Sequence, residues 1–305
     1  MKGFLNKDDY RLRFPPLKKN IRTDILVVGG GLEGILTAYC AAIKGKKVAV
    51  AEKFFIGAGR TAFLPGCLTP NIKSPNALKE YESAVGIITG AAADAGGFSV
   101  SRLPFFFFSE KPLSLPEGAE FFRGEDLAEF RQSVPDGVFI QNGCAAFNTV
   151  AFCKALAEKC RLSETDIYEA TGIVSAFDGT ATTDGGYRIG YEHIVNATGK
   201  GENGKRRFLI CADFAGVNIP RIAFGDGSFS PLTAFSENGR RLKAVVLART
   251  RTGALLEKRR LEEGLSALLG IPLSQTKIHI GECRGAFSVA DICRKAASEI
   301  DARTL

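Results

Sequence analysis

The feature that most constrains this chain is the stretch DILVVGGGLEGILTAYCAAIKGKKVAVAEK, residues 24–53, in which three consecutive glycines follow a short apolar run. Residues 24–28 are a β-branched run that predicts a buried strand, and residues 33–44 predict a helix that ends at Gly45. The apolar run 47–52 predicts the next strand. Together they predict a β–α–β unit, which implies two parallel strands joined by a right-handed crossover.

The glycines have the spacing Gly29-x-Gly31-x-x-Gly34, with Gly30 between the first two. The first glycine of such a pattern permits a tight turn, the second lets a pyrophosphate approach the main chain, and the third lets helix and strand pack closely. The start of the helix adds free N–H groups that favour phosphate. Glu52 closes the second strand, where a carboxylate can accept hydrogen bonds from both ribose hydroxyls and disfavours a 2′-phosphate. These residues predict a site for an adenine dinucleotide.

The rest of the chain predicts an alternation of helices and strands without repeats. Helices are predicted at 76–93, 148–160, 254–269 and 286–301, and strands at 105–108, 166–175, 186–196, 207–212, 220–224 and 242–248. Asn148 or Thr149 is placed to cap its helix, and Pro104 should mark the beginning of a strand of four phenylalanines buried on both faces. The segment DGTATTDGG, 178–186, predicts a turn between two strands.

Composition narrows the functional classes. The chain of 305 residues is 45% hydrophobic and 24% charged, which is typical of a soluble globular protein, and its length predicts one large or two interleaved domains. Its cysteines are best explained as buried reduced thiols, which predicts a cytoplasmic protein. No apolar stretch approaches the roughly 20 residues of a transmembrane helix. The net charge of +7 is scattered without interleaved aromatic residues, so no nucleic-acid partner is predicted. Eight cysteines without a CxxC pair predict neither a metal site nor disulfides, and two histidines without GxSxG argue against a Ser-His-Asp hydrolase.

Residues 24–70 resemble the beginning of the FAD-dependent oxidoreductases of the D-amino-acid oxidase/glycine oxidase (DAO) superfamily, in which a loop rich in Gly, Ser and Thr follows the β–α–β unit. That loop is EKFFIGAGRTAFLPGCLTP here, and HIVNATGKG, 193–201, resembles the second flavin-contacting strand of the superfamily. ATGIVSAF, 170–177, lies where a main-chain contact to adenine is expected. The resemblance implies FAD as the cofactor, and it adds these residues to the binding site: Lys53, Gly59, Arg60, Thr61, Val174, Ala197, Thr198 and Gly199.

The resemblance also implies the fold class: an α/β protein with a Rossmann-like FAD-binding domain, a parallel sheet with helices, and a smaller antiparallel-sheet substrate domain. We expect the FAD-binding domain to be discontinuous. It would comprise 22–66, 146–200 and 271–305, while the substrate domain would comprise 67–145 and 201–270. Residues 1–21, which are charged and contain Pro15 and Pro16, would form an extended amino-terminal arm.

The implied activity is oxidation of a small amine or amino acid by hydride transfer to flavin N5, with an acceptor that the sequence does not identify. A dehydrogenase of a hydroxy compound, of the glycerol-3-phosphate or 2-hydroxyglutarate type, is an alternative within enzymes. A degenerate flavin-binding protein without turnover and an NAD-binding module are alternatives outside that reaction. A homo-oligomer or a subunit of a larger complex is compatible with the sequence.

No catalytic residue is identified, and two residues are candidates. Cys67 is either a flavin-facing thiol, or attachment point, or a buried core residue. Arg102 could hold a substrate carboxylate bidentately or could form a surface ion pair.

Two departures from the superfamily pattern favour the non-catalytic alternative. Glu33 replaces a small or hydroxylated residue, and beside a pyrophosphate its carboxylate would repel the phosphates unless the side chain points to solvent. The carboxyl-terminal flavin contact is shortened, with Gly281 and Gly285 as its only echo.

Overall fold

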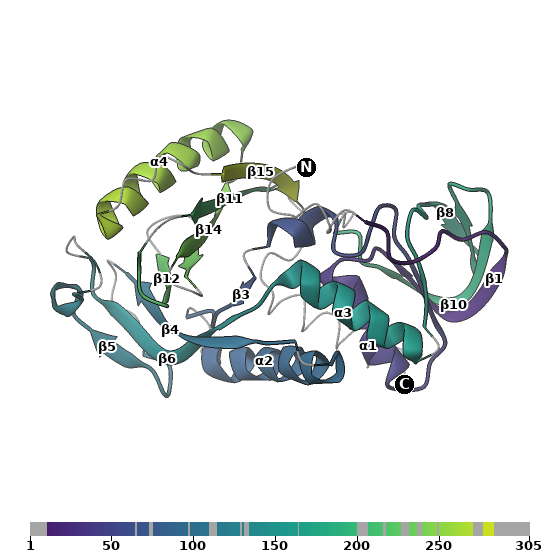
Figure 1. The fold of residues 1–305 in the computed structure, drawn as a ribbon, viewed down its shortest axis with the longest axis horizontal. Coiled ribbons are helices and arrows are strands. Elements are labelled where there is room, and N and C mark those ends of the chain that lie inside the picture. Colours follow the sequence, from purple (N-terminus) through teal and green to yellow (C-terminus); the bar gives the residue numbers. More distant parts are fainter. Residues whose placement is uncertain are drawn as a thin grey trace.

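The computed structural model is shown in Figure 1. It describes residues 11–283 except for these positions: 65, 73–75, 97, 110–114, 129, 131–133, 164, 200–206, 216–217, 227–231, 237–239, 249 and 271–276. The predicted helix at 286–301 lies outside the described residues, and so does Gly285.

Helices are interspersed with strands in the first half of the described chain, and strands β7 to β14 follow one another without a helix between them. The helices are α1 (Leu32–Ala42), η2 (Gly59–Phe63), α2 (Ala77–Asp94), η3 (Gly124–Asp126), α3 (Thr149–Leu162) and α4 (Arg251–Leu269). The first ten strands are β1 (Ile21–Val28), β2 (Val48–Ala51), β3 (Cys67–Leu68), β4 (Ser101–Phe108), β5 (Glu120–Phe122), β6 (Gly137–Ala146), β7 (Asp166–Tyr168), β8 (Ile173–Phe177), β9 (Thr180–Thr183) and β10 (Arg188–Asn196). The others are β11 (Arg207–Ala215), β12 (Ala223–Asp226), β13 (Leu232–Phe235), β14 (Arg241–Ala248) and β15 (Lys277–Cys283).

The first sheet contains the predicted β–α–β unit. Its strand order is β7-β2-β1-β10-β9-β8, and the pairs from β7 to β10 are parallel, whereas β9 pairs antiparallel with β10 and β8. The parallel strands therefore end at one edge of the sheet, and β1 lies between β2 and β10. This edge is where an open parallel sheet binds its ligand.

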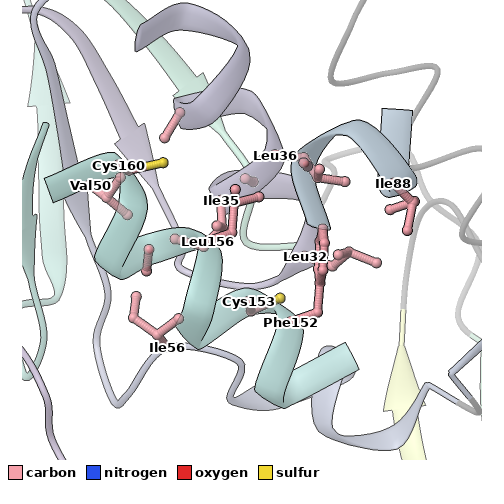
Figure 2. Packing of buried hydrophobic residues seen from close by; sticks show 14 of the residues in the cluster. Leu32, Ile35, Leu36, Val50, Ile56, Ile88, Phe152, Cys153, Leu156 and Cys160 are labelled. Carbon is pink, nitrogen blue, oxygen red and sulfur yellow. The ribbon is translucent and has the colours of Figure 1, made fainter. Parts of the chain in front are cut away.

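Helices α1 and α3 pack on one face of the first sheet, and α2 packs against α3 and joins the same core. In Figure 2, Ile35 and Leu36 of α1 lie beside Leu156 of α3 and Ile88 of α2. Successive β1 residues alternate between faces, because Ile25 and Val27 join this core while Leu26 joins a smaller cluster on the other face. Both faces of the central strands are buried, as is typical of parallel sheets.

The second sheet has the order β15-β11-β14-β13-β12-β4-β6-β3, with β5 paired to β6, and only its β4–β12 pair is parallel. Helix α4 lies across it in Figure 1, where Leu261, Leu265 and Leu269 join a core rich in phenylalanine. The expected α/β class, with a parallel Rossmann-like sheet and a mainly antiparallel second sheet, is therefore confirmed.

The four phenylalanines of β4 bury both faces of that strand. Phe106 and Phe108 join the core beneath α4, whereas Phe105 joins a cluster on the opposite face. The predicted start at Pro104 is wrong, because β4 begins at Ser101. The register shifts between Leu103 and Phe105, so Pro104 lies at an irregularity, a place where a proline without an N–H group can be accommodated.

Other boundaries needed correction. The predicted turn at 178–186 contains strand β9, which pairs with both of its neighbours. Strands β3, β5, β6, β13 and β15 were not predicted. β15 pairs with β11 of the second sheet although it falls within 271–305. Helix α2 packs in the core of the first sheet although it falls within 67–145. The proposed division into two domains stays a prediction.

Residues 11–20 lack helix and strand but are anchored to the first sheet. Phe14 is 3% exposed, the N–H groups of Arg13 and Phe14 donate to the carboxylate of Glu169, and the N–H of Leu17 donates to the hydroxyl of Thr171 at 3.1 Å. The arm therefore depends on side chains about 150 residues further along the chain.

The described residues contain no membrane-spanning helix, no cluster of metal ligands and no disulfide. No helix there is long and apolar enough to cross a membrane. No group of His, Cys, Asp and Glu among them could hold a metal ion. The cysteines whose side chains are described are free thiols: Cys40, Cys67, Cys144, Cys153 and Cys160.

Candidate dinucleotide-binding site

The glycine turn connects β1 to α1 and has the close contacts that its spacing predicted. Gly29 has φ +110°, a conformation that other residues rarely adopt, and its N–H donates to Ala51 O at 2.9 Å. A Cβ on Gly34 would lie 1.9 Å from the carbonyl oxygen of Gly29. The first and third glycines therefore permit the turn and the helix–strand contact.

Glu52 points at this turn from the end of β2. Its carboxylate accepts hydrogen bonds from the N–H of Gly30 at 2.6 Å and of Phe54 at 2.8 Å, and the residue is 8% exposed. A carboxylate has about four acceptor positions, so two backbone donors leave room for two ribose hydroxyls. The predicted acid therefore lies at the glycine turn.

Burial is the main influence on the ionisation of Glu52. Desolvation raises the pKa of its carboxyl above the ordinary value of 4.5, the N–H groups of Gly30 and Phe54 oppose this rise, and the negative charge of Glu169 adds to it. The folded chain therefore holds a proton on Glu52 more tightly than the unfolded chain does.

We expect a pH-dependent stability from this group. A carboxyl whose pKa is raised on folding contributes most to the unfolding free energy at a pH below its pKa in the unfolded chain. That contribution is lost as the pH rises from 4.5 through the pKa of the folded chain. The unfolding free energy of the wild type relative to Glu52→Gln should therefore fall with rising pH over that window. Urea unfolding of the nucleotide-free protein between pH 4 and 8 measures it, and a flat or rising difference would contradict the assignment.

The amino terminus of α1 meets the loop that follows β2. The hydroxyl of Thr61 accepts a hydrogen bond from the N–H of Leu32 at 2.9 Å, and a Cβ on Gly31 would lie 2.8 Å from that hydroxyl. The first N–H groups of a helix have no acceptor inside it. Thr61 therefore lies where the sequence places a pyrophosphate.

Three contacts hold this loop in place. The N–H of Ile56 donates to Glu169 Oε1 at 2.6 Å, and the N–H of Gly57 donates to Gly30 O at 2.9 Å. Thr149, the first residue of α3, donates its hydroxyl to Thr61 O at 3.2 Å. The position of η2 is therefore determined by β7, the glycine turn and α3 together.

Arg60 of η2 faces the first turn of α1. Its Nη2 lies 3.4 Å from Oε2 of Glu33, and their side chains are only 15% and 6% exposed. The side chain of Glu33 does not point to solvent, because the residue is 5% exposed, and its carboxylate is therefore expected to repel a pyrophosphate. Arg60 compensates its buried charge.

A third segment reaches the turn from β10. A Cβ on Gly29 would lie 2.8 Å from Ala197 O, and one on Gly199 would lie 3.4 Å from Cζ of Arg60. Gly199 has φ +68°, and Thr198 hydrogen-bonds through its N–H and hydroxyl to Asn196 Oδ1 at 3.2 and 2.7 Å. The predicted Ala-Thr-Gly segment therefore lies beside the glycines and Arg60.

The remaining predicted binding residues lie around this centre. Lys53 is exposed, and its Cγ lies 3.4 Å from where a Cβ on Gly172 would be. Gly59 begins η2 with φ +65°. Val174 lies on β8 at a register irregularity, with a side chain that is 65% exposed. The role of each in binding stays a prediction.

The two catalytic candidates do not join the glycine turn. Cys67 is 6% exposed, pairs with Ala146 through β3 and β6, and belongs to the core of the second sheet. Arg102 donates to the hydroxyl of Tyr81 at 2.7 Å and to Glu82 at 3.0 Å. The structure therefore shows Cys67 as a buried core residue and Arg102 in an ion pair.

Glu169 is a site residue that sequence analysis missed. It follows β7 as Glu52 follows β2, and the parallel pairing of Ala51 with Tyr168 places both acids at one edge of the sheet. An acid directly after a strand was the available signal, but β7 has only three residues, Asp-Ile-Tyr, and was not separated from β8 in the prediction.

These residues fit an adenine dinucleotide. A glycine turn without side chains, a helix amino terminus, a guanidinium and a hydroxyl converge where two phosphates would lie, and an acid follows at the ribose position. The backbone N–H groups and the guanidinium of Arg60 are suitable donors to phosphate oxygens. The negative charge of Glu33 would repel those oxygens.

Comparisons with known proteins agree with this geometry. Residues 24–206 match the family described as FAD dependent oxidoreductase (DAO). A glycine oxidase of Bacillus licheniformis is 25% identical over 174 residues, 50% of this chain and 47% of that protein, so the match spans about half of this curated relative.

Solved structures share the fold at low sequence identity. An L-proline dehydrogenase from P. horikoshii has a TM-score of 0.70 at 15% identity, covering 94% of this chain and 93% of that one. A glycine oxidase from Geobacillus kaustophilus has a TM-score of 0.68 at 14% identity, covering 93% and 94%. FAD is the cofactor of the family whose model matches. Because that match covers more than half of the chain, the chain belongs to the FAD dependent oxidoreductases of the DAO family.

Proposed function

We propose that this protein binds FAD at the glycine turn and oxidises a small amine or amino acid. The observation that carries the proposal is the convergence of three separated segments, the turn at 29–34, the loop at 52–61 and the segment 197–199, at the carboxyl ends of β1, β2 and β10. A turn that served packing alone would need neither the second-strand acid nor the third segment.

FAD, when bound, supplies the hydride acceptor for a carbon that carries an amine or hydroxyl. The chain supplies the binding: Glu52 accepts hydrogen bonds from the ribose, and the N–H groups at the start of α1, together with Arg60 and Thr61, hold the phosphates. Ala197, Thr198 and Gly199 bring main chain close to the cofactor. A reaction of this kind needs orientation and exclusion of water more than a side-chain nucleophile.

The relatives support the substrate class. The names of the two glycine oxidases and of the L-proline dehydrogenase each contain an amino acid. We therefore propose a small amino acid or amine as the substrate in preference to a hydroxy compound. We also propose, from the sequence, that the protein is cytoplasmic and has no nucleic-acid partner.

Absorbance spectroscopy of the purified protein tests the proposal. A flavin spectrum that bleaches under anaerobic conditions with an amine or amino acid supports it, while bleaching only with hydroxy acids would favour the dehydrogenase alternative. Bound FAD that no substrate reduces would indicate a flavin-binding protein without turnover. A colourless protein that takes up no FAD on reconstitution would contradict the proposed cofactor site.

The variant Gly31→Val should lose FAD while keeping the fold. A Cβ at this position would lie 2.8 Å from the hydroxyl of Thr61, which accepts the N–H of Leu32, so valine would press against Thr61 and place a side chain beside the proposed phosphate position. We expect the dissociation constant for FAD to rise tenfold or more, about 1.4 kcal/mol. Fluorescence titration measures it.

Gly190→Val is the matched control for that experiment. Gly190 lies within β10, and its Cβ would come no closer than 3.6 Å to the side chain of Arg22, an ordinary contact. Its affinity for FAD should equal that of the wild type, and full retention of FAD by Gly31→Val would contradict the binding geometry.

A further inference from the structure

The buried carboxylate of Glu33 lies within the phosphate site itself. It belongs to the first turn of α1, its side chain is 6% exposed, and its Oε2 lies 3.4 Å from Arg60 Nη2. Both the helix amino terminus and a guanidinium stabilise an anion at this position. Among the described residues, both are positive groups that the site offers to a pyrophosphate.

The environment separates this pair from an ordinary surface ion pair. In α4, Arg259 and Glu263 form an exposed pair whose side chains are 80% and 65% accessible, so water screens its charges. Arg60 and Glu33 are 15% and 6% accessible, and their charges act on a neighbouring ligand with little screening. A phosphate group that binds beside Arg60 therefore meets the negative charge of Glu33 as well as the guanidinium.

Three segments restrict the movement of the pair. The hydroxyl of Thr149 donates a hydrogen bond to the carbonyl oxygen of Thr61, the residue after Arg60. A Cβ built on Gly199 would lie 3.4 Å from Cζ of Arg60. Glu33 lies in the first turn of α1, and the next residue, Gly34, is packed against the glycine turn. The guanidinium therefore has a carboxylate on one side and the proposed cofactor position around Gly199 on the other.

We propose that Glu33 is an internal counter-ion of the phosphate site. Its carboxylate holds Arg60 when no dinucleotide is present, and binding of a pyrophosphate requires the guanidinium to exchange this carboxylate for phosphate oxygens. Glu33 therefore lowers the affinity of the chain for nucleotides that carry phosphates. This inference rests on the proposed function as an FAD-binding protein.

Calorimetric titration of the full-length protein, freed of bound nucleotide by dialysis, tests the inference. The probes are FAD, ADP and adenosine, which share the adenosine group but differ in phosphate. Glu33→Gln removes the charge and keeps the shape, while Glu33→Ser removes charge and length, so that one variant remains if the other does not fold. Glu263→Gln removes the same charge from the exposed pair of α4 and is the matched control.

We expect both Glu33 variants to bind FAD and ADP about tenfold tighter than the wild type or better, because a buried like charge has been removed. Adenosine should bind with unchanged affinity, and Glu263→Gln should bind all three probes as the wild type does.

Unchanged or weaker binding of FAD and ADP by the Glu33 variants would overturn the inference, as would an equal gain for adenosine. Loss of folding in both variants would also overturn it, since Glu33 would then act in folding. If neither the wild type nor any variant binds FAD or ADP, the proposed function fails and the inference fails with it. Binding of FAD without an effect of Glu33 contradicts the inference alone.

Discussion

Gly34→Ala should destabilise the protein by more than about 3 kcal/mol, although alanine is the best helix former. A Cβ at this position would lie 1.9 Å from the carbonyl oxygen of Gly29 and 3.3 Å from the side chain of Ala197. The oxygen belongs to backbone on the turn, which cannot move aside as a flexible side chain can. Relief would require α1 to shift away from β1.

Gly90→Ala is the matched control, because Gly90 lies inside α2 and a Cβ there meets nothing within 4 Å. That variant should gain up to about 1 kcal/mol from helix propensity. Urea unfolding followed by circular dichroism measures both variants. A Gly34→Ala protein as stable as Gly90→Ala would show that the turn and helix can separate without loss, which contradicts the packing described here.

Glu169→Ala should cost about 3 to 5 kcal/mol of unfolding free energy. The side chain is fully buried, and its carboxylate accepts hydrogen bonds from the N–H groups of Arg13, Phe14 and Ile56. Removing it leaves three backbone donors without this acceptor, each at a cost of about 1 to 3 kcal/mol when it stays buried. Because Ile56 leads into the loop of Arg60 and Thr61, affinity for FAD should fall as well.

Two further variants sharpen this test. Glu169→Gln keeps one acceptor oxygen and places an amide donor against the remaining N–H groups, so its stability should lie between those of wild type and Glu169→Ala. Glu192→Ala removes an exposed glutamate of β10 and should change stability by less than about 0.5 kcal/mol. Equal midpoints of urea unfolding for Glu169→Ala and Glu192→Ala would show that the anchoring bonds do not contribute.

Local patterns were the most predictable part of this protein. The helices predicted at 33–44, 76–93 and 148–160 are α1, α2 and α3 within two residues at each end, and Asn148 caps α3 by accepting a hydrogen bond from the N–H of Ala151. Helical periodicity and capping depend on residues within a few positions of one another, so a single stretch of sequence contains the information.

Short strands were less predictable because their stability comes from their neighbours. β9 has four residues in a segment rich in turn formers, and β7 has three, yet each is paired along its length. The register irregularity beside Pro104 likewise depends on the partner strand β6. Pairing across a sheet joins distant residues, and local propensity does not determine it.

In the candidate site, the sequence by itself determined the glycine turn and the acid at the end of β2, because both depend on backbone conformation at a fixed spacing. The Ala-Thr-Gly segment was predicted from the resemblance to the superfamily. Only the tertiary structure decided where the charged side chains lie: Glu33 against Arg60, Arg102 against Glu82, and Glu169 beneath the amino-terminal arm. The physical reason is that a charged side chain finds its partner in space and not along the sequence. The buried Glu33 and Glu169 require such partners, and the partners in these three cases lie 20 to 155 residues away along the chain.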